Sequence, residues 1–230
     1  MHVYFLQHHP DYGPARISDW LTGMGHSYNI CRLYHDEMPP KLADFDALVV
    51  LDGPDSALDE APYPNIKRER KLIERTLASA KPLMGIGYGG CLIAQSLGAI
   101  VSPGTFAELG WHGVVRAPAC RLPLPERFDA FHWHREIFGL PQEAHPVGST
   151  TASPIQGFSW DDERVIALLF HLEATATSAQ AIAEVALECV GGDEPGGFIQ
   201  SRGEMFEATR RFDRLAPMLD RVMMAWLRLG

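Results

Sequence analysis

Residues 82–94 read Pro-Leu-Met-Gly-Ile-Gly-Tyr-Gly-Gly-Cys-Leu-Ile-Ala, a short apolar run followed by clustered glycines and a second apolar run. The first run, over residues 82–86, is typical of a strand buried on both faces of a parallel sheet. The second run predicts a helix over residues 92–97, which Gly98 closes. Because a strand that leads directly into a helix is the building unit of open α/β sheets, this stretch indicates the fold class.

The same alternation of strand and helix extends along the chain on both sides of this stretch. Apolar runs predict further strands, and three- and four-residue apolar spacing predicts helices. The predicted strands cover residues 3–7, 46–51 and 165–170, and the predicted helices cover residues 17–24, 66–80, 178–189 and 210–227. Strands joined by helices imply right-handed crossovers and a parallel sheet.

The middle of the chain has a different pattern. Short β-like runs separated by proline and glycine fill residues 111–160, which predicts an antiparallel insertion. Residues 191–203 are polar and glycine-rich, which predicts a loop. We therefore expect one α/β domain over residues 1–230, with an open, mostly parallel sheet flanked by helices and a small antiparallel insertion.

Composition excludes several classes of protein. The chain has 230 residues, of which 46% are apolar and 21% charged, so it is too apolar to be disordered. Its formal net charge of −9 argues against a nucleic-acid-binding surface. No apolar run is long enough to span a bilayer, and the first residues lack the pattern of a signal peptide. We therefore expect a cytoplasmic protein with neither nucleic acid nor membrane as a partner.

The four cysteines leave one hypothesis open. They are widely spaced and form no Cys-x-x-Cys pair, which argues against both a disulfide framework and a zinc site. A single catalytic thiol remains to be considered. Cys91 lies in the opening stretch, whereas the others are distant from it in sequence: Cys31, Cys120 and Cys189.

Chemistry in an open α/β sheet gathers at the carboxyl ends of its strands. Here those ends carry residues 52–54 (Asp-Gly-Pro), the glycine-rich turn 85–91 and residues 170–173 (Phe-His-Leu-Glu). The turn suits a phosphate cradle, a nucleophile elbow or simple close packing, but no Lys-Ser/Thr pair follows it, as a P-loop requires. His171 and Glu173 are two apart and point to one side of an extended segment, so the carboxylate can orient the imidazole. The alternative is a histidine that only bonds the backbone.

Taken together, these segments resemble the class I glutamine amidotransferase family. Residues 82–94 align without gaps with the family pattern P-x-x-G-I-C-x-G-x-Q-L-I-A, and residues 170–173 match F-H-P-E. Gly53 matches a glycine of the family's G-G-P-x-S loop. Residues 108–111 and 133–141 match the E-L-G-W and W-H-x-x-x-F-x-L-P stretches of the GMP-synthase-like branch.

This resemblance implies a flavodoxin-like fold and the hydrolysis of glutamine to glutamate and ammonia, without a cofactor. In such a site His171 transfers protons, Glu173 orients it, and the backbone N–H groups of Gly53 and Tyr88 form the oxyanion hole. The residues expected in the substrate pocket are Cys91, His134 and Glu108. The expected ligand is glutamine or a similar small amide. Any ammonia transfer would need a separate synthetase subunit, since no synthetase segment is recognised in the sequence.

The sequence departs from the family at the reacting position. Gly87 stands where relatives carry the nucleophilic cysteine, and Cys91 replaces the pocket glutamine. We therefore predict that cysteine-dependent glutaminase activity is absent. The alternatives are a non-catalytic module that binds a small ligand or regulates a partner, and a hydrolase that uses Cys91. Two changes in one motif favour natural divergence over an engineered knockout.

The sequence contains other histidines that are candidate ligands. His132 and His134 are two apart on a predicted strand, but no third ligand has a helpful spacing, so we expect no metal site. The family motif favours a pocket or structural role for His134. His8 and His9 follow the first strand, and we expect them to be a surface pair.

Overall fold

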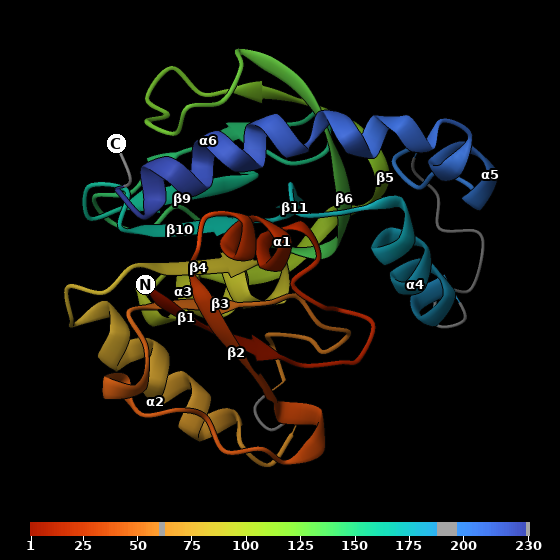
Figure 1. Ribbon diagram of the computed structural model, residues 1–230. Coiled ribbons are helices and arrows are strands. Elements are labelled where there is room, and N and C mark those ends of the chain that lie inside the picture. Colours follow the sequence, from red (N-terminus) through yellow and green to blue (C-terminus); the bar gives the residue numbers. More distant parts are fainter. Residues whose placement is uncertain (60–62, 188–196, 229–230) are drawn as a thin grey trace.

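The computed structural model describes residues 1–59, 63–187 and 197–228, and in this part of the chain it contains two sheets (Figure 1). The first sheet has seven strands, in the spatial order β2 (Ser27–Arg32), β1 (His2–Gln7), β3 (Ala47–Val50), β4 (Leu83–Ile86), β10 (Val165–Leu168), β9 (Gly157–Trp160) and β7 (His145–Pro146). The strands from β2 to β10 run parallel, and β9 and β7 are antiparallel to their neighbours. The predicted α/β class with a mostly parallel sheet is confirmed.

Helices cover both faces of this sheet (Figure 1). On one face lie α1 (Arg16–Gly23) and α6 (Ala216–Trp226), and on the other lie α2 (Ile66–Leu77) and α3 (Tyr88–Ser96). The remaining helical segments are α4 (Ala176–Leu187), α5 (Arg202–Phe206), η1 (Leu33–His35), η2 (Leu42–Asp44) and η3 (Thr209–Arg214). None of the helices in the described part of the chain has the length and apolarity that a bilayer-spanning segment needs.

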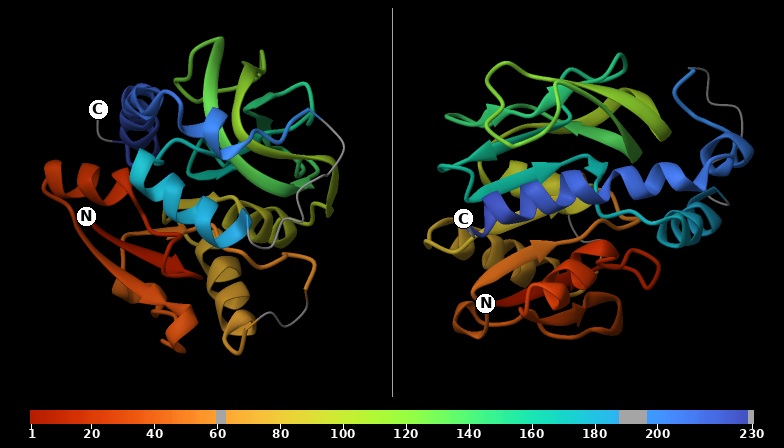
Figure 2. Two further views of the ribbon diagram at one scale, coloured as in Figure 1. Left: turned by 90° about the vertical axis from the view of Figure 1, so that its right-hand side faces the viewer. Right: turned by 45° about the horizontal axis from the view of Figure 1, so that its top comes forward.

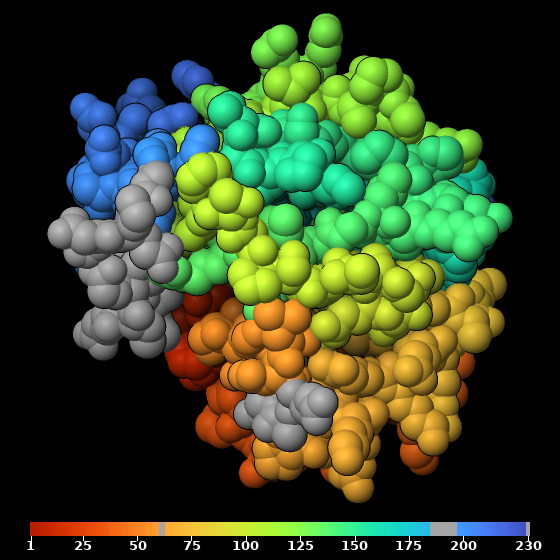
Figure 3. Space-filling view, turned by 180° about the vertical axis from the view of Figure 1, so that it is seen from behind, coloured from red at the N-terminus to blue at the C-terminus, as the bar shows by residue number. Residues whose placement is uncertain are grey.

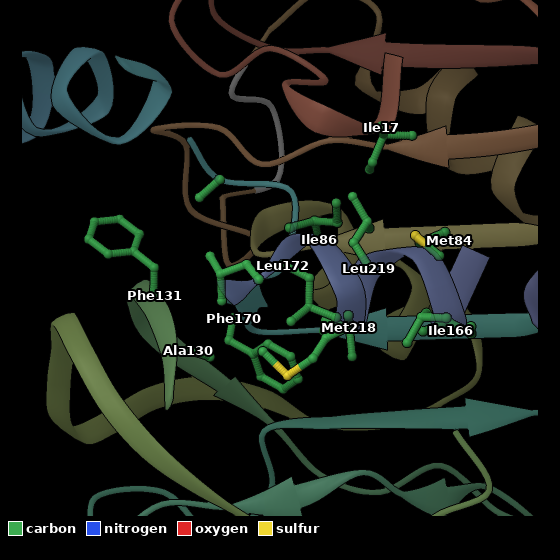
Figure 4. Packing of buried hydrophobic residues seen from close by; sticks show 14 of the residues in the cluster. Ile17, Met84, Ile86, Ala130, Phe131, Ile166, Phe170, Leu172, Met218 and Leu219 are labelled. Atoms are coloured by element: carbon green, nitrogen blue, oxygen red, sulfur yellow. The ribbon is translucent and has the colours of Figure 1, made fainter. Parts of the chain in front are cut away.

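The double coverage explains why the central strands are continuous apolar runs. On β3 the side chains alternate, so that Ala47 and Val49 enter one core while Leu48 and Val50 enter the other. All four are fully buried. Figure 4 shows part of the first core, in which Ile86 of the sheet and Leu219 of α6 are packed together. Burial of apolar surface on both faces is what holds the sheet between its helices.

The second sheet is antiparallel and contains β11 (Phe170–His171), β6 (Arg127–Phe138), β5 (Val101–Arg116) and β8 (Gly148–Ser149), in that order. Both views in Figure 2 show its long green strands on the side of the molecule away from the red N-terminal strands. Since β11 carries the chain directly on from β10, this sheet begins at the carboxyl edge of the first one. The predicted antiparallel insertion is confirmed.

Several elements differ from the sequence expectation in their bounds, and one strand was not expected. Helix α3 begins at Tyr88 rather than residue 92, because Gly89 and Gly90 form its first turn against the sheet instead of a loop. Strand β5 begins at Val101 rather than 111, because an irregularity between Pro103 and Glu108 interrupts its pattern. Strand β2 was not predicted, since it is an edge strand with alternating exposure.

The C-terminal region also differs in detail. The segment predicted as one helix over 210–227 is a 3-10 helix, η3, followed by α6, with a proline in the first turn of α6. Within the predicted loop 191–203, residues 202–203 begin the short helix α5, which a capping box at Ser201 starts. Cys189, the end of the predicted helix 178–189, and residues 191–196 of that loop lie outside the described residues.

Candidate active site

The turn between β4 and α3 has the backbone geometry of an elbow. Gly87 joins the two elements with φ 53° and ψ −117°, a backbone conformation that residues other than glycine rarely adopt. Its N–H donates to the carbonyl of Leu168 at 2.8 Å, and its carbonyl accepts from the N–H of Cys91 at 3.1 Å. The elbow is therefore held by β10 on one side and by the first turn of α3 on the other.

Glycines allow α3 to pack closely on the sheet. A Cβ added to Gly89 would lie 2.2 Å from the carbonyl oxygen of Val50 in β3. A Cβ on Gly85 would lie 2.6 Å from the carbonyl oxygen of Gly89. Both contacts involve backbone atoms that cannot move aside, so these two glycines fix how closely the helix start approaches β3 and β4.

Asp52, which follows β3, fills the space above the elbow. Its Oδ1 accepts a hydrogen bond from the backbone N–H of Tyr88 at 2.7 Å. A Cβ on Gly87 would lie 2.2 Å from the same Oδ1. The Asp52 carboxylate thus occupies the place into which a side chain at position 87 would project, and it accepts from one of the two N–H groups predicted for the oxyanion hole.

His171, on β11, lies between two carboxylates. Its Nδ1 is 2.7 Å from Glu173 Oε1, and its Nε2 is 3.5 Å from Asp52 Oδ2. All three side chains are buried. Burial lowers the pKa of His171, but the charge and hydrogen bond of Glu173 and the charge of Asp52 outweigh it, so the pKa is raised. The structure thus brings together the elbow, the two N–H groups, His171 and Glu173.

Burial raises the pKa of the Asp52 carboxyl, whereas it lowers that of the His171 ring. The positive charge of His171 and the backbone N–H groups of Tyr88 and Gly53 oppose the rise in the pKa of Asp52. The charge of Asp52 raises the pKa of His171 and the charge of His171 lowers the pKa of Asp52, so the protonation of each group depends on the other.

A cavity of about 320 Å³ opens beside this group of residues, within the range usual for small-molecule sites. The residues that line it and belong to the predicted site are Gly53, Gly87, Tyr88, Cys91 and His134. Glu108, predicted for the pocket, is fully buried and is not among the described residues lining the cavity. The loop after β3 borders the start of β5 on the face shown in Figure 3, where orange residues meet yellow-green ones.

Comparison with known proteins gives the family. The family model for class I glutamine amidotransferases matches residues 11–187. The chain belongs to the class I glutamine amidotransferase family. It is 27% identical over 214 residues to the glutamine amidotransferase-like protein YfeJ of Salmonella typhimurium, covering 89% of each chain.

Three further proteins are similar to this chain in sequence or in fold. A glutamine-hydrolysing GMP synthase of Thermus thermophilus is 31% identical over 150 residues, which are 63% of this chain but 28% of that protein. A crystal structure of a glutamine amidotransferase from Thermotoga maritima superposes with a TM-score of 0.87 at 25% identity, over 99% of this chain and 98% of that one. One from Methylobacillus flagellatus has a TM-score of 0.90 at 24% identity, over 98% and 94% of the two chains.

Cys91 lies one turn into α3, at the cavity wall. Its side chain is buried, and the pKa of its thiol is raised well above the ordinary value by burial and by the charges of Glu136 and Asp52. Among the described residues no hydrogen bond joins this thiol to His171. The other described cysteines, Cys31 and Cys120, do not line the amidotransferase cavity.

His8 is not part of a surface pair, and that expectation was wrong. It is 5% exposed, because the chain after β1 turns beneath the loop that follows β3. Its Nε2 lies 2.9 Å from Glu69 Oε1 of α2, and its Cβ would be 2.8 Å from a Cβ on Gly53. His8 therefore supports the loop that carries Asp52 and Gly53.

Asp52 is the site residue that the sequence analysis missed. It stands at the first glycine of the family's G-G-P-x-S loop, one residue before Gly53. The sequence did contain a signal: position 52 has a side chain where the family pattern has glycine, and position 87 has glycine where the pattern has cysteine. Only the fold shows that the two positions compete for the same space.

Proposed function

We propose that this chain is a catalytically silent class I glutamine amidotransferase that binds glutamine or a similar small amide without hydrolysing it. The observation that carries the proposal is the Asp52 carboxylate, which lies where the nucleophile's side chain would project and accepts from Tyr88 N–H. The cavity beside it has room for an amino-acid-sized ligand.

Two requirements of acyl transfer are missing from the site. Gly87 offers no nucleophile. The N–H of Tyr88 already donates to Asp52 Oδ1, so it is not free for a developing oxyanion.

The hydrolase alternative depends on Cys91, and its surroundings do not favour it. A thiol whose pKa is raised by burial and by nearby carboxylates holds little of the nucleophilic thiolate at neutral pH. Activation would require a nearby base, and no described residue forms that contact. The silent binding module is therefore the better supported function.

Regulation of a partner fits the same proposal. The chain spans about a quarter of the length of the GMP synthases it resembles, and this likeness suggests a synthetase subunit as the partner. A domain that binds glutamine without consuming it would report glutamine availability to such a subunit. We propose a separate synthetase as the partner class and cytoplasm as the location.

Restoring the missing groups tests the proposal. We expect no glutamate release from the wild-type chain or from Asp52→Gly, because neither has a nucleophile at position 87. We also expect none from Gly87→Cys, because its Cβ would lie 2.2 Å from the Asp52 carboxylate. The double variant Asp52→Gly/Gly87→Cys should exceed the wild-type rate by about 100-fold or more, since removing a triad nucleophile costs more than that. Adding His171→Ala to the double variant should abolish the gain.

Two results would contradict this function. One is glutaminase activity in the wild-type chain, and the other is an equal gain from Gly87→Cys alone.

Calorimetric titration with glutamine tests binding directly, and we expect saturable heat from the wild-type protein. A thiol-directed glutamine analogue should label the double variant at position 87. Labelling of the wild-type chain at Cys91 would instead support the hydrolase alternative.

A further inference from the structure

A second group of buried polar side chains lies in the antiparallel sheet. Strand pairing places Glu108 of β5 directly opposite His134 of β6, with His132 two residues along on the same face. Glu108 and His132 are 0% exposed and His134 is 7% exposed. The sequence offered no third ligand for the two histidines at a helpful spacing, whereas the neighbouring strand supplies a carboxylate.

Several polar atoms of this group have no hydrogen-bond partner among the described residues. They are both ring nitrogens of His132, Nε2 of His134 and Oε1 of Glu108. Buried polar atoms are almost always satisfied, so unsatisfied atoms on three neighbouring residues call for a missing partner. One atom from each residue lies close enough to the other two to share a single partner.

The hydrogen bonds around the group turn a lone pair toward the carboxylate. His134 Nδ1 lies 3.2 Å from the carbonyl oxygen of Glu136, which can only accept, so Nδ1 carries the hydrogen. In the neutral ring Nε2 is then an acceptor, and it faces Glu108 Oε2 at 3.3 Å outside hydrogen-bonding geometry. Two acceptors this close repel each other unless a positive charge lies between them.

Neighbouring side chains hold the carboxylate in place. Gln156 Nε2 donates to Glu108 Oε2 at 2.5 Å and also to Thr150 Oγ1 at 3.1 Å. Metal-binding histidines commonly donate their other ring N–H to a backbone carbonyl, and metal-binding carboxylates are themselves hydrogen-bonded. Glu108 and His134 have these supports.

We propose that Glu108, His132 and His134 bind one divalent transition-metal ion, such as Zn²⁺. One ligand atom from each residue lies within 4.8 Å of the others. In a tetrahedral zinc site two neighbouring ligand atoms lie about 3.3 Å apart, so closure around an ion needs a movement of up to roughly 1.5 Å. Two imidazoles and a carboxylate suit zinc, cobalt or iron(II) better than calcium or magnesium.

The ion would lie at one wall of the amidotransferase cavity, because His134 also lines that cavity. It would fix β5 against β6 and orient the His134 ring toward the ligand. The inference is independent of the proposed silence of the elbow, since none of Asp52, Gly87 and His171 is among the ligands.

Metal binding by the full chain tests this site. After chelator treatment, titration with Co²⁺ should give one equivalent per chain and visible absorption bands distinct from those of aqueous Co²⁺. In Glu108→Gln, which preserves the side-chain shape, and in His132→Asn, the affinity should fall at least about tenfold. The control His35→Asn removes an exposed histidine and should leave the affinity unchanged.

Zn²⁺ provides a second measurement. It should raise the melting temperature of the wild-type chain and of His35→Asn, but not of the other two variants. If a variant fails to fold, the wild-type stoichiometry and Co²⁺ spectrum decide the question. Absence of stoichiometric Co²⁺ in the wild-type chain would overturn the site, and the unsatisfied atoms would then be served by a second proton on His134 or by water. Equal Co²⁺ affinity in folded Glu108→Gln would also overturn it.

Discussion

At the scale of single residues, the proposed silent site has charged groups on both sides of the His171 ring. In a working triad the thiolate is the anion next to the imidazole, and here the Asp52 carboxylate takes that position at 3.5 Å from His171 Nε2. Glu173 lies on the other side of the ring at 2.7 Å. The ring therefore has a carboxylate partner on each side, which is compatible with the proposed loss of the thiolate.

The pKa of His171 should depend on Glu173. Glu173 is the largest of the contributions that raise this pKa, so Glu173→Gln should lower it. Titration of the His171 ring by NMR measures the change. An unchanged pKa would show that Asp52 alone keeps the ring protonated.

The same pKa sets a dependence of stability on pH. Because the folded-state pKa of His171 lies above the unfolded value of 6.5, its contribution to the free energy of unfolding is complete below pH 6.5. That contribution disappears as the pH rises through the folded-state value. The stability difference between the wild-type chain and Glu173→Gln should shrink over that range, as urea unfolding at several pH values would show.

Much of this site was accessible from sequence, and the rest was not for a physical reason. His171, Glu173, Gly53 and Tyr88 follow strands whose ends meet at one sheet edge, so motif and periodicity sufficed to group them. The role of Asp52 depends on the distance between two loops. No periodicity encodes such a distance.

At the scale of elements, α3 sits where it does because its first turn lacks side chains. Gly89 lets the helix backbone approach β3, and Gly85 lets β4 pass beneath that turn. Since Gly87 is the first point at which the chain leaves the sheet, this packing also determines the direction of the elbow.

Alanine substitutions separate this packing from ordinary helix propensity. Gly89→Ala should lower the free energy of unfolding by about 1–3 kcal/mol, because its Cβ would lie 2.2 Å from the carbonyl oxygen of Val50. Gly23→Ala, at the end of α1 with nothing within 4 Å of the added Cβ, should leave stability unchanged or raise it by up to about 1 kcal/mol. Urea denaturation measures both, and equal effects would contradict the packing argument.

Strands and helices could be predicted where burial leaves a clear hydrophobic pattern in the sequence. The runs that became β3, β4 and β10 are buried on both faces, so their apolar sequences are unbroken. Strand β2 at the sheet edge and the irregular start of β5 carry no such pattern. The pairing of Glu108 with His134 is a property of strand register, which the sequence alone leaves open.

At the scale of the whole molecule, the two ends of the chain are tied to the same sheet. Trp20 of α1 donates to Asp220 of α6 at 2.8 Å, and Trp226 of α6 donates to the carbonyl of Arg164 at 3.1 Å. The two apolar cores lie on opposite faces of shared strands such as β3. We therefore retain the expectation of one domain over residues 1–230.

A single domain should unfold cooperatively. Tryptophan fluorescence and far-UV circular dichroism should give one coincident thermal transition, with equal calorimetric and van't Hoff enthalpies. Because neither core can lose its packing without exposing the strands it shares with the other, an intermediate with one intact core is not expected. Two separated transitions would instead show that the antiparallel sheet unfolds independently.

Under the proposed loss of the nucleophile, the shared space of Asp52 and position 87 also has a consequence for evolution. A reversion that restores cysteine first would need the Asp52 side chain to move, because the added Cβ would lie 2.2 Å from its Oδ1. A lineage that first returned residue 52 to glycine would pass through a chain with neither group. Neither single step would then restore the proposed lost activity, so both substitutions would be needed before selection could act on it.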